Sequence, residues 1–160
     1  MAFISENTID QITVELENSD AKFEEALIRI EEEQPHILAY LFNENFDVLT
    51  NSEKDYLLFL AITIWKSTKK EVGTIALVNE NTIGSAEEQN WEFMTAAKGK
   101  TFRDRLDIFF NNTPQEDLLA FVEDALTLDD EEDRTVTKEG REPMFVALKT
   151  VIDVITKTDS

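Results

Sequence analysis

Apolar residues recur along most of the chain at spacings of three and four, which is the pattern of helices with one buried face. Four residues after position 19 share such a face: Phe23, Ala26, Leu27 and Ile30. They predict a helix that begins at Ser19 or Asp20. Pro35 should interrupt it and open a second, short helix, because proline lacks an amide donor and clashes with the preceding turn.

Capping residues mark the starts of further helices. A Ser or Thr followed three residues later by Glu has capping-box spacing, in which each side chain satisfies a free backbone amide of the first turn. This spacing occurs at Thr50 and Glu53, and again at Ser85 and Glu88. Other starts are predicted at Thr101, at Pro114 after Thr113, and between Lys138 and Pro143. Gly99 is expected to end the helix that begins at Ser85.

The segment from Tyr56 to Trp65 is apolar at nine of its ten positions. A helix that is apolar on nearly all sides is normally surrounded by other helices. We therefore predict that this segment is the central helix of the fold. The last helix places four apolar residues on one stripe: Met144, Leu148, Val151 and Ile155.

Two short stretches fit more than one secondary structure. The run from Ile75 to Val78 could form a strand, a buried loop or a helical turn. In the stretch from Ile12 to Leu16 the alternation of apolar residues fits a strand, whereas Ile9, Ile12 and Leu16 also have helical spacing. Both stretches stay open at this point.

Together these elements predict an all-α protein, an irregular bundle of about seven helices around residues 56–65 with at most a marginal strand. The chain has 160 residues and is 42% hydrophobic, which is sufficient for one domain with a substantial core. No Gly-rich or Pro-rich linker divides it. We expect a single helical domain over residues 1–160, with 1–18 as a candidate for a loosely attached N-terminal segment.

The formal net charge of −19 limits the partners that the chain can bind. A surface this negative repels phosphate groups, so we expect no direct binding to nucleic acid and none to anionic membranes. No apolar run approaches the ~20 residues that span a bilayer. The absence of cysteine fits a cytoplasmic location. The remaining options are a basic protein partner, metal cations, or no charge-dependent partner.

Most catalytic and cofactor patterns are missing from the chain. His36 is the only histidine, so zinc sites with two or three histidines are excluded, and Glu33-x-x-His36 is only half of a carboxylate-bridged di-iron pattern. No P-loop, dinucleotide fingerprint or G-x-S-x-G motif occurs. We therefore name no catalytic residue, no metal ligand and no cofactor.

One catalytic alternative remains, a magnesium-dependent all-α nucleotide hydrolase. Mg²⁺ needs only a few carboxylates and water, and these can come from neighbouring helices. The candidate acids on neighbouring turns are Glu24, Glu25, Glu87, Glu88, Glu116, Asp117, Glu123 and Asp124.

Two charged clusters are candidate interaction sites. Five consecutive acids follow the helix predicted after Pro114: Asp129, Asp130, Glu131, Glu132 and Asp133. They do not fit an EF-hand loop, because its sixth and twelfth positions would fall on Arg134 and Gly140, and we interpret them as a solvated loop. The second cluster is basic: Lys98, Lys100, Arg103 and Arg105. It could bind an acidic ligand or pair with the protein's own carboxylates.

The sequence therefore favours a non-catalytic protein-interaction module whose negative surface steers a basic partner. A sharper alternative is an inhibitor or immunity-type protein whose carboxylates imitate nucleic-acid phosphates. Residues 1–35 would be its natural face, because they contain ten acids against Lys22 and Arg29. The sequence leaves the formation of a homodimer as an open question, and repulsion between two negative surfaces opposes it. Trp65 and Trp91 are interpreted as core residues rather than ligand-stacking residues.

Overall fold

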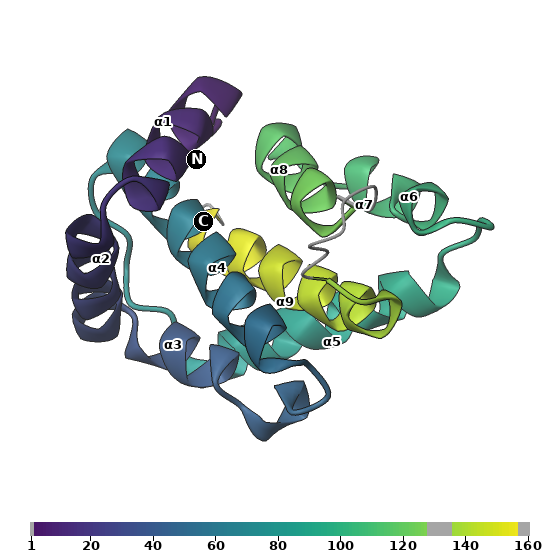
Figure 1. Ribbon diagram of the computed structural model, residues 1–160. Coiled ribbons are helices and arrows are strands. Elements are labelled where there is room, and N and C mark those ends of the chain that lie inside the picture. Colours follow the sequence, from purple (N-terminus) through teal and green to yellow (C-terminus); the bar gives the residue numbers. More distant parts are fainter. Residues whose placement is uncertain (1, 128–135, 157–160) are drawn as a thin grey trace.

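The computed structural model describes residues 2–127 and 136–156 (Figure 1). Within these ranges the chain forms nine α-helices and a short 3₁₀ turn, and no strand, which confirms the all-α prediction. The helices are α1 (Glu6–Glu17), α2 (Asp20–Glu33), α3 (Pro35–Leu41), α4 (Asn51–Val72), α5 (Glu80–Ala96), α6 (Phe102–Arg105), α7 (Asp107–Phe110), α8 (Glu116–Leu126) and α9 (Lys138–Thr156). None of these described helices combines the length and apolar composition that crossing a bilayer requires.

The two longest helices, α4 and α9, pack against each other in the middle of the bundle. Helices α1 and α2 cover one side of α4, and α5 and α8 pack against α9 (Figure 1). The segment from Tyr56 to Trp65 lies within α4, as predicted for a central helix, and it contributes Leu57, Leu60, Ala61, Ile62 and Ile64 to the core.

Helix α9 is buried on more sides than the sequence indicated. The predicted stripe is buried, but so are the residues between its members: Phe145, Val146, Ala147 and Ile152. The ring of Phe145 packs edge-on against the rings of both Phe102 and Phe109. The burial extends beyond the predicted stripe because α4, α5 and α8 all pack against α9.

Glu53 joins the first turns of α4 and α9. The predicted capping box is present, since Thr50 N donates to Glu53 Oε1 over 2.8 Å and Glu53 N donates to Thr50 Oγ1 over 3.1 Å. The second carboxylate oxygen, Oε2, accepts from the backbone N of Thr137 over 2.8 Å and from its hydroxyl over 2.9 Å. Thr137 directly precedes α9, so one carboxylate lies near the positive dipole ends of both central helices.

The Glu53 side chain is fully buried, which would normally disfavour its charged form. Burial indeed raises the pKa of Glu53, but the hydrogen bonds from Thr50 and Thr137 outweigh this effect and hold the pKa below its usual value. The buried group is therefore a carboxylate anion at neutral pH.

The start and end predicted for α5 are wrong. The helix begins at Glu80, because the side chain of Asn79 accepts a hydrogen bond from Thr82 N over 2.8 Å and caps the helix six residues before the Ser85 signal. It ends at Ala96, so Gly99 lies in the loop that follows and does not cap it.

Two other predicted helices differ in detail. The helix predicted from Thr101 is capped there but breaks at Leu106 into the one-turn helices α6 and α7. Helix α8 begins at Glu116 rather than at Pro114, because the Thr113 hydroxyl accepts from Gln115 N and forms a turn instead of a helix cap.

Two buried glutamines, each directly before a helix, hold extended segments by backbone hydrogen bonds. Before α3, Gln34 Oε1 accepts from Val78 N over 3.0 Å and Gln34 Nε2 donates to the Ala76 carbonyl over 2.9 Å. The run from Ile75 to Val78 is therefore an extended loop held by a side-chain amide, and not a strand.

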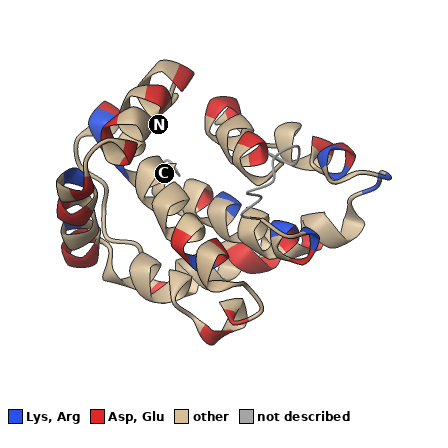
Figure 2. Cartoon of the chain, in the orientation of Figure 1, with Lys and Arg blue, Asp and Glu red and all other residues tan. Residues whose placement is uncertain are grey.

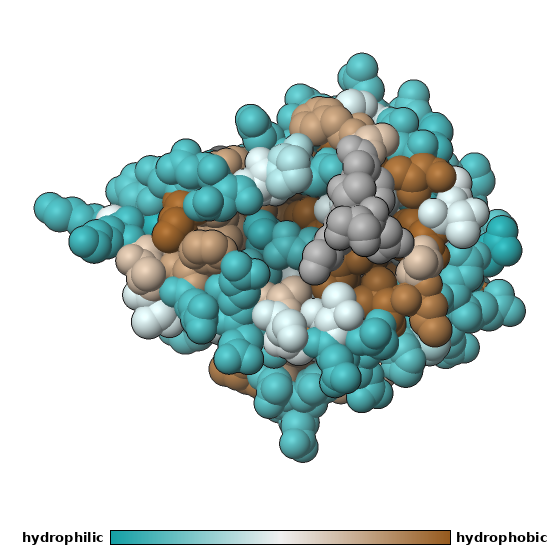
Figure 3. Space-filling model, turned by 180° about the vertical axis from the view of Figure 1, so that it is seen from behind, coloured by the Kyte–Doolittle hydropathy of each residue, from teal (hydrophilic) through white to brown (hydrophobic). Residues whose placement is uncertain are grey.

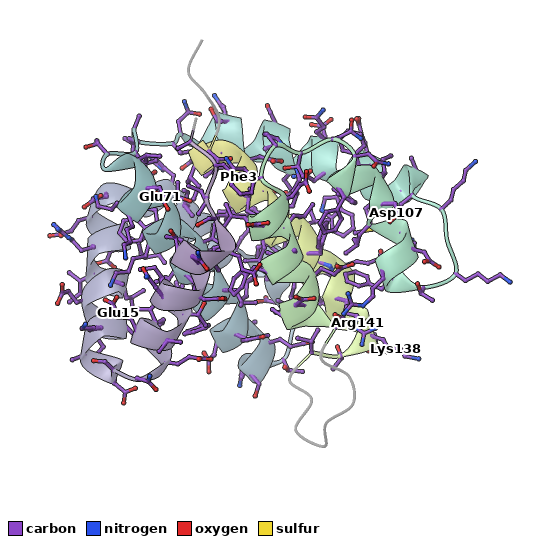
Figure 4. All side chains as sticks on the ribbon, turned by 90° about the horizontal axis from the view of Figure 1, so that it is seen from above. Phe3, Glu15, Glu71, Asp107, Lys138 and Arg141 are labelled. Atoms are coloured by element: carbon purple, nitrogen blue, oxygen red, sulfur yellow. The ribbon has the colours of Figure 1, made fainter. Side chains whose placement is uncertain are left out.

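Gln115 plays the same role for the start of the chain. Ile4 N donates to Gln115 Oε1 over 3.0 Å, and Gln115 Nε2 donates to the Ala2 carbonyl over 3.0 Å. The ambiguous stretch from Ile12 to Leu16 lies in α1, which packs against α4 and α8. The ion pair of Glu15 with Lys66 and the hydrogen bond from Thr8 to Glu71 tie α1 to α4 (Figure 4).

We expect Glu53→Gln to lower the free energy of unfolding by about 1–3 kcal/mol, because the amide loses charge-assisted bonds at two helix starts. Urea denaturation at neutral pH measures this loss. Asp55→Asn, at an exposed acid of α4, is the control and should cost under about 0.5 kcal/mol.

The same variant has a pH signature. Because the folded pKa of Glu53 is lowered, its stabilisation is complete above the unfolded-state value of 4.5 and is lost as the pH falls through the folded pKa. The difference between wild type and Glu53→Gln should therefore shrink as the pH falls below 4.5 and through the folded pKa. A difference that stays constant from neutral pH down would show that the charge contributes nothing.

We expect Gly140→Ala and Gly84→Ala to change stability in opposite directions. A Cβ at Gly140 would overlap the Glu53 carboxylate, so this variant should lose about 1–3 kcal/mol. At Gly84, inside α5, nothing lies within 4 Å of an added Cβ, so alanine should gain roughly 0.5–1 kcal/mol of helix stability. Thermal unfolding of both variants tests this pair, and shifts of the same sign would contradict it.

Candidate interaction surfaces

The acidic run predicted as one candidate site, residues 129–133, lies outside the described residues. The basic cluster lies at the end of the molecule where α6 and the start of α9 meet (Figure 2). Lys138 and Arg141 lie at this end too, opposite Glu15 and Glu71 (Figure 4).

The structure divides the basic cluster into two pairs. Arg103 forms ion pairs with Glu123 over 3.2 Å and with Asp124 over 3.8 Å. Arg105 forms an ion pair with Glu142 on α9 and donates a second hydrogen bond to the Met94 carbonyl over 3.0 Å. These two residues pair with the protein's own carboxylates, which is one of the two alternatives that the sequence left open.

Lys98 and Lys100 make up the other pair, on the exposed loop between α5 and α6. Neither forms an ion pair with a described residue. The four residues of the cluster therefore do not converge on one binding site.

The contact with Arg103 does not decide the pKa of Glu123. Burial raises the pKa of Glu123, Arg103 lowers it, and the neighbouring carboxylates of Asp124 and Asp107 raise it, with a net increase. The Glu123 side chain is partly buried on α8, and its carboxyl binds a proton more readily than that of an ordinary exposed glutamate.

Most described cations are already paired inside the molecule, whereas most described carboxylates are not. Ion pairs engage Lys22, Arg29, Lys54, Lys66, Lys69, Arg103, Arg105 and Lys149. Asp and Glu residues occur on nearly every helix (Figure 2), and most of those without such a partner are exposed. The excess negative charge is therefore at the surface and uncompensated within the described part of the chain.

The described residues offer no assembled metal centre. Within 2–127 and 136–156 no three His, Cys, Asp or Glu side chains are placed to hold a metal ion. Glu33 binds Lys69 and Arg29, and His36 faces Glu80 over 3.6 Å, so the half-motif Glu33-x-x-His36 does not close on itself. The hydrolase alternative stays a prediction from the sequence.

The outer face of α2 carries an isolated apolar side chain. Ile28 is 60% exposed, although it is an isoleucine. Four exposed glutamates lie three or four residues from it along the helix: Glu24, Glu25, Glu31 and Glu32. This face belongs to residues 1–35, the region that the sequence marked as the most acidic.

Helix α5 carries a second acidic surface, which is hollowed. A hollow of about 330 Å³ lies between α3 and α5 and is lined by His36, Ala39, Tyr40, Asn43, Glu80, Ile83, Gly84 and Glu87. A broader, shallower depression continues along α5 and is lined by Gly84, Glu87, Glu88, Trp91, Glu92, Thr95 and Ala96. Because Gly84 and Glu87 line both, we treat them as one feature, the α5 groove.

Trp91 lies in this groove and is 37% exposed, whereas Trp65 is only 2% exposed. The interpretation of both tryptophans as core residues is therefore right for Trp65 and wrong for Trp91. Its neighbours indicated this, because Glu87, Glu88 and Glu92 place Trp91 on a charged helix face. Met94, one turn further along α5, is buried in the core instead.

A buried polar network fixes the groove to the core. The Tyr40 hydroxyl donates to Glu87 Oε2 over 2.7 Å, and burial together with Glu87 raises the pKa of Tyr40, which stays a phenol. On the inner side of α5, Asn90 donates to Asp153 over 3.0 Å and to the Thr150 hydroxyl over 3.1 Å. Helix α5 is thus held in register with α3 and α9.

Another hollow, of about 690 Å³, lies between the start of α5 and the end of α9. Uncharged amides and hydroxyls dominate its lining: Asn79, Asn81, Thr82, Ser85, Gln89, Thr113 and Thr156. Its one carboxylate, Asp153, already accepts from Asn90 and Lys149. This hollow therefore presents little charge to a partner.

Exposed apolar side chains are scattered over several elements: Phe3, Val14, Ile28, Phe42, Val48, Leu77 and Trp91. On the face turned away in Figure 1, apolar patches are interrupted by hydrophilic side chains (Figure 3). The larger share of the surface is charged or polar, which favours recognition by charge with a few apolar contacts.

Comparison of the chain with protein-family models, with curated proteins and with solved structures finds no match.

We expect Arg105→Ala to lower the free energy of unfolding by about 1–3 kcal/mol, because it leaves Glu142 without its cation and removes one of the two donors to the Met94 carbonyl. Lys98→Ala removes an exposed cation with no described partner and should change stability by less than about 0.5 kcal/mol. Urea titration of both variants measures the difference. Equal, small effects would mean that Arg105 is not engaged internally in solution.

Proposed function

We propose that the protein is a non-catalytic interaction module that binds a basic protein partner. The observation that carries this proposal is the unequal use of charge. Most described Lys and Arg side chains are already in ion pairs with the protein's own carboxylates, while most carboxylates have no cation partner. A positively charged surface can supply the missing partners.

The physical consequence of such a surface is faster and more selective association. A field of one sign raises the encounter rate with an oppositely charged protein by roughly 10- to 1000-fold at low ionic strength. The same field repels acidic proteins, so it selects partners as well as attracting them. The apolar side chains that interrupt the charge, Ile28 and Trp91, would then hold the partner after the encounter.

The rigid scaffold supports this function. The acids lie on helices whose inner faces are packed against α4 or α9, so the pattern of charges is set before a partner arrives. A preformed surface avoids part of the ordering cost of association. An inhibitor that covers the nucleic-acid-binding site of a basic protein is a special case of this function.

We expect association with a basic partner to slow steeply with salt. The immobilised protein is exposed to a cell extract at low ionic strength, and proteins eluted by salt are identified and purified. The association rate constant with a purified partner should fall at least about tenfold between 20 and 300 mM salt, because the Debye length shortens from roughly 20 Å to less than 10 Å. The dissociation rate should change much less.

The controls use the partner's own charge. Proteins of similar size with acidic isoelectric points should not be retained. Competition by duplex DNA would identify the partner's nucleic-acid-binding face as the contact, as the inhibitor hypothesis requires. A partner that associates equally fast at both salt concentrations, or retention of acidic proteins only, would refute the proposed function.

A further inference from the structure

The α5 groove has the shape and position of a docking site for an extended chain. It runs along the outer face of α5 from Glu80 to Thr95, which is about 22 Å at the rise of an α-helix. About seven residues of an extended polypeptide span this length. The groove is open in the middle because Gly84 has no side chain, and nothing described lies within 4 Å of a Cβ placed there.

Gly84 is costly for the helix that contains it. Glycine in a helix interior is less favourable than alanine by roughly 0.5–1 kcal/mol, and an alanine would fit here without contact. The absence of a side chain thus serves no packing need within the described structure. It does let another chain approach the backbone of α5 between the two hollows.

The groove presents negative charge next to an exposed aromatic ring. Trp91 lies one turn beyond Glu87 and Glu88 on the same face, and Glu92 is its direct neighbour. A cation over an indole ring is attracted by the ring's negative face, and carboxylates beside it can accept its hydrogen bonds. This is a combination that suits a cationic side chain better than a neutral one.

Among the residues that the structure describes, no Lys or Arg occupies this position. Neither hollow is lined by a Lys or Arg, and Lys69 contacts the buried Trp65 instead. The one titratable base at the groove, His36, lies at its far end against Glu80. The Tyr40 hydroxyl holds Glu87 in place but supplies no positive charge.

We propose that the α5 groove binds an arginine-containing segment of the basic partner, with one guanidinium on the face of Trp91 and hydrogen-bonded to Glu87 or Glu88. This inference rests on the proposed function and names the surface that carries it. Arginine fits better than lysine, because its planar group stacks on an indole ring and binds a carboxylate through two parallel N–H groups. The main chain of the segment lies against Gly84, which is one helical turn from Glu87 and Glu88.

The groove is a better site for this segment than α2. Both surfaces are acidic, but α2 offers the aliphatic Ile28, which has no π-face for a cation. The face of α2 also includes Arg29, whose charge opposes a basic segment, whereas the groove has no Lys or Arg in its lining. Of these two surfaces, only the α5 groove combines negative charge with an exposed aromatic ring.

The test uses the full chain, labelled with ¹⁵N, and a heptapeptide in which serine and arginine alternate, blocked at both ends. At 150 mM salt the peptide should shift the amide signals of Gly84 and Thr95 and the indole signal of Trp91, and leave those of Glu24 and Ile28 in place. A peptide with lysine for arginine should bind more weakly. The dissociation constant is taken from the titration.

Two single variants probe the ring and the opening. Trp91→Leu keeps an apolar side chain and should weaken peptide binding by roughly threefold to thirtyfold, the range of a cation–π contact. Gly84→Leu adds a good helix former where there is space, so the fold is retained while the groove is blocked, and binding should fall by at least about tenfold. Circular dichroism and thermal unfolding verify that both variants are folded.

Two double variants remove the same amount of charge from the two surfaces. Glu88→Gln with Glu92→Gln should weaken binding at least about fivefold, and Glu24→Gln with Glu25→Gln less than about twofold at a Debye length of ~8 Å. Larger loss in the α2 pair, or equal loss in both pairs, would overturn the inference. Absence of peptide binding, while the basic partner of the salt experiment still binds, overturns the inference alone and leaves the proposed function intact.

Discussion

The structure depends on one buried carboxylate at the place where its two central helices begin. Glu53 accepts hydrogen bonds from Thr50 at the start of α4 and from Thr137 at the start of α9. Two opposing effects meet there: burial disfavours the anion, whereas the three hydrogen bonds that the carboxylate accepts from Thr50 and Thr137, together with two helix dipoles, favour it. Gly140 lets α9 approach the carboxylate closely. The resulting junction fixes α9 relative to α4, and the other helices pack around this pair.

The rest of the charge follows from that arrangement. Because α4 and α9 are covered by α1, α2, α5 and α8, the polar side chains of the covering helices point away from the core. The cations are used to join helices, as Lys66 joins α4 to α1 and Arg105 joins α6 to α9. The chain has too few cations to neutralise the rest. Its surface is consequently negative in a pattern that the scaffold holds rigid.

Local sequence signals predicted the helices well and their contacts poorly. The cap at Thr50, the start at Pro35 and the apolar segment 56–65 are recognised from neighbouring residues, and all three are present. Contacts between distant residues are different in kind. The hydrogen bond that Thr137 donates to Glu53 joins two residues that no local pattern connects. The same is true of the hydrogen bond that Val78 donates to Gln34. The extent of burial of α9 likewise depends on three partners that its own sequence does not specify.

The candidate site illustrates the same limit. The sequence drew attention to runs of like charge, yet Arg103 and Arg105 prove to be engaged inside the molecule. The α5 groove contains no run of like charge. Its residues are spread over two helices, and one of these residues is a glycine. A tryptophan with glutamates at helical spacing was the one local sign of it.

Helix α5 combines structural support and an open surface because its two faces do different work. Its inner face carries the buried Asn90 and Met94, and the hydrogen bonds of Asn90 to α9 keep that face in register. Its outer face carries the glutamates, Trp91 and the gap at Gly84. A change on the outer face that keeps Glu87 and its hydrogen bond from Tyr40 therefore alters what the helix can bind without loosening how it is held. The Gly84 position is the clearest case, because there a side chain that would strengthen the helix would also close the groove.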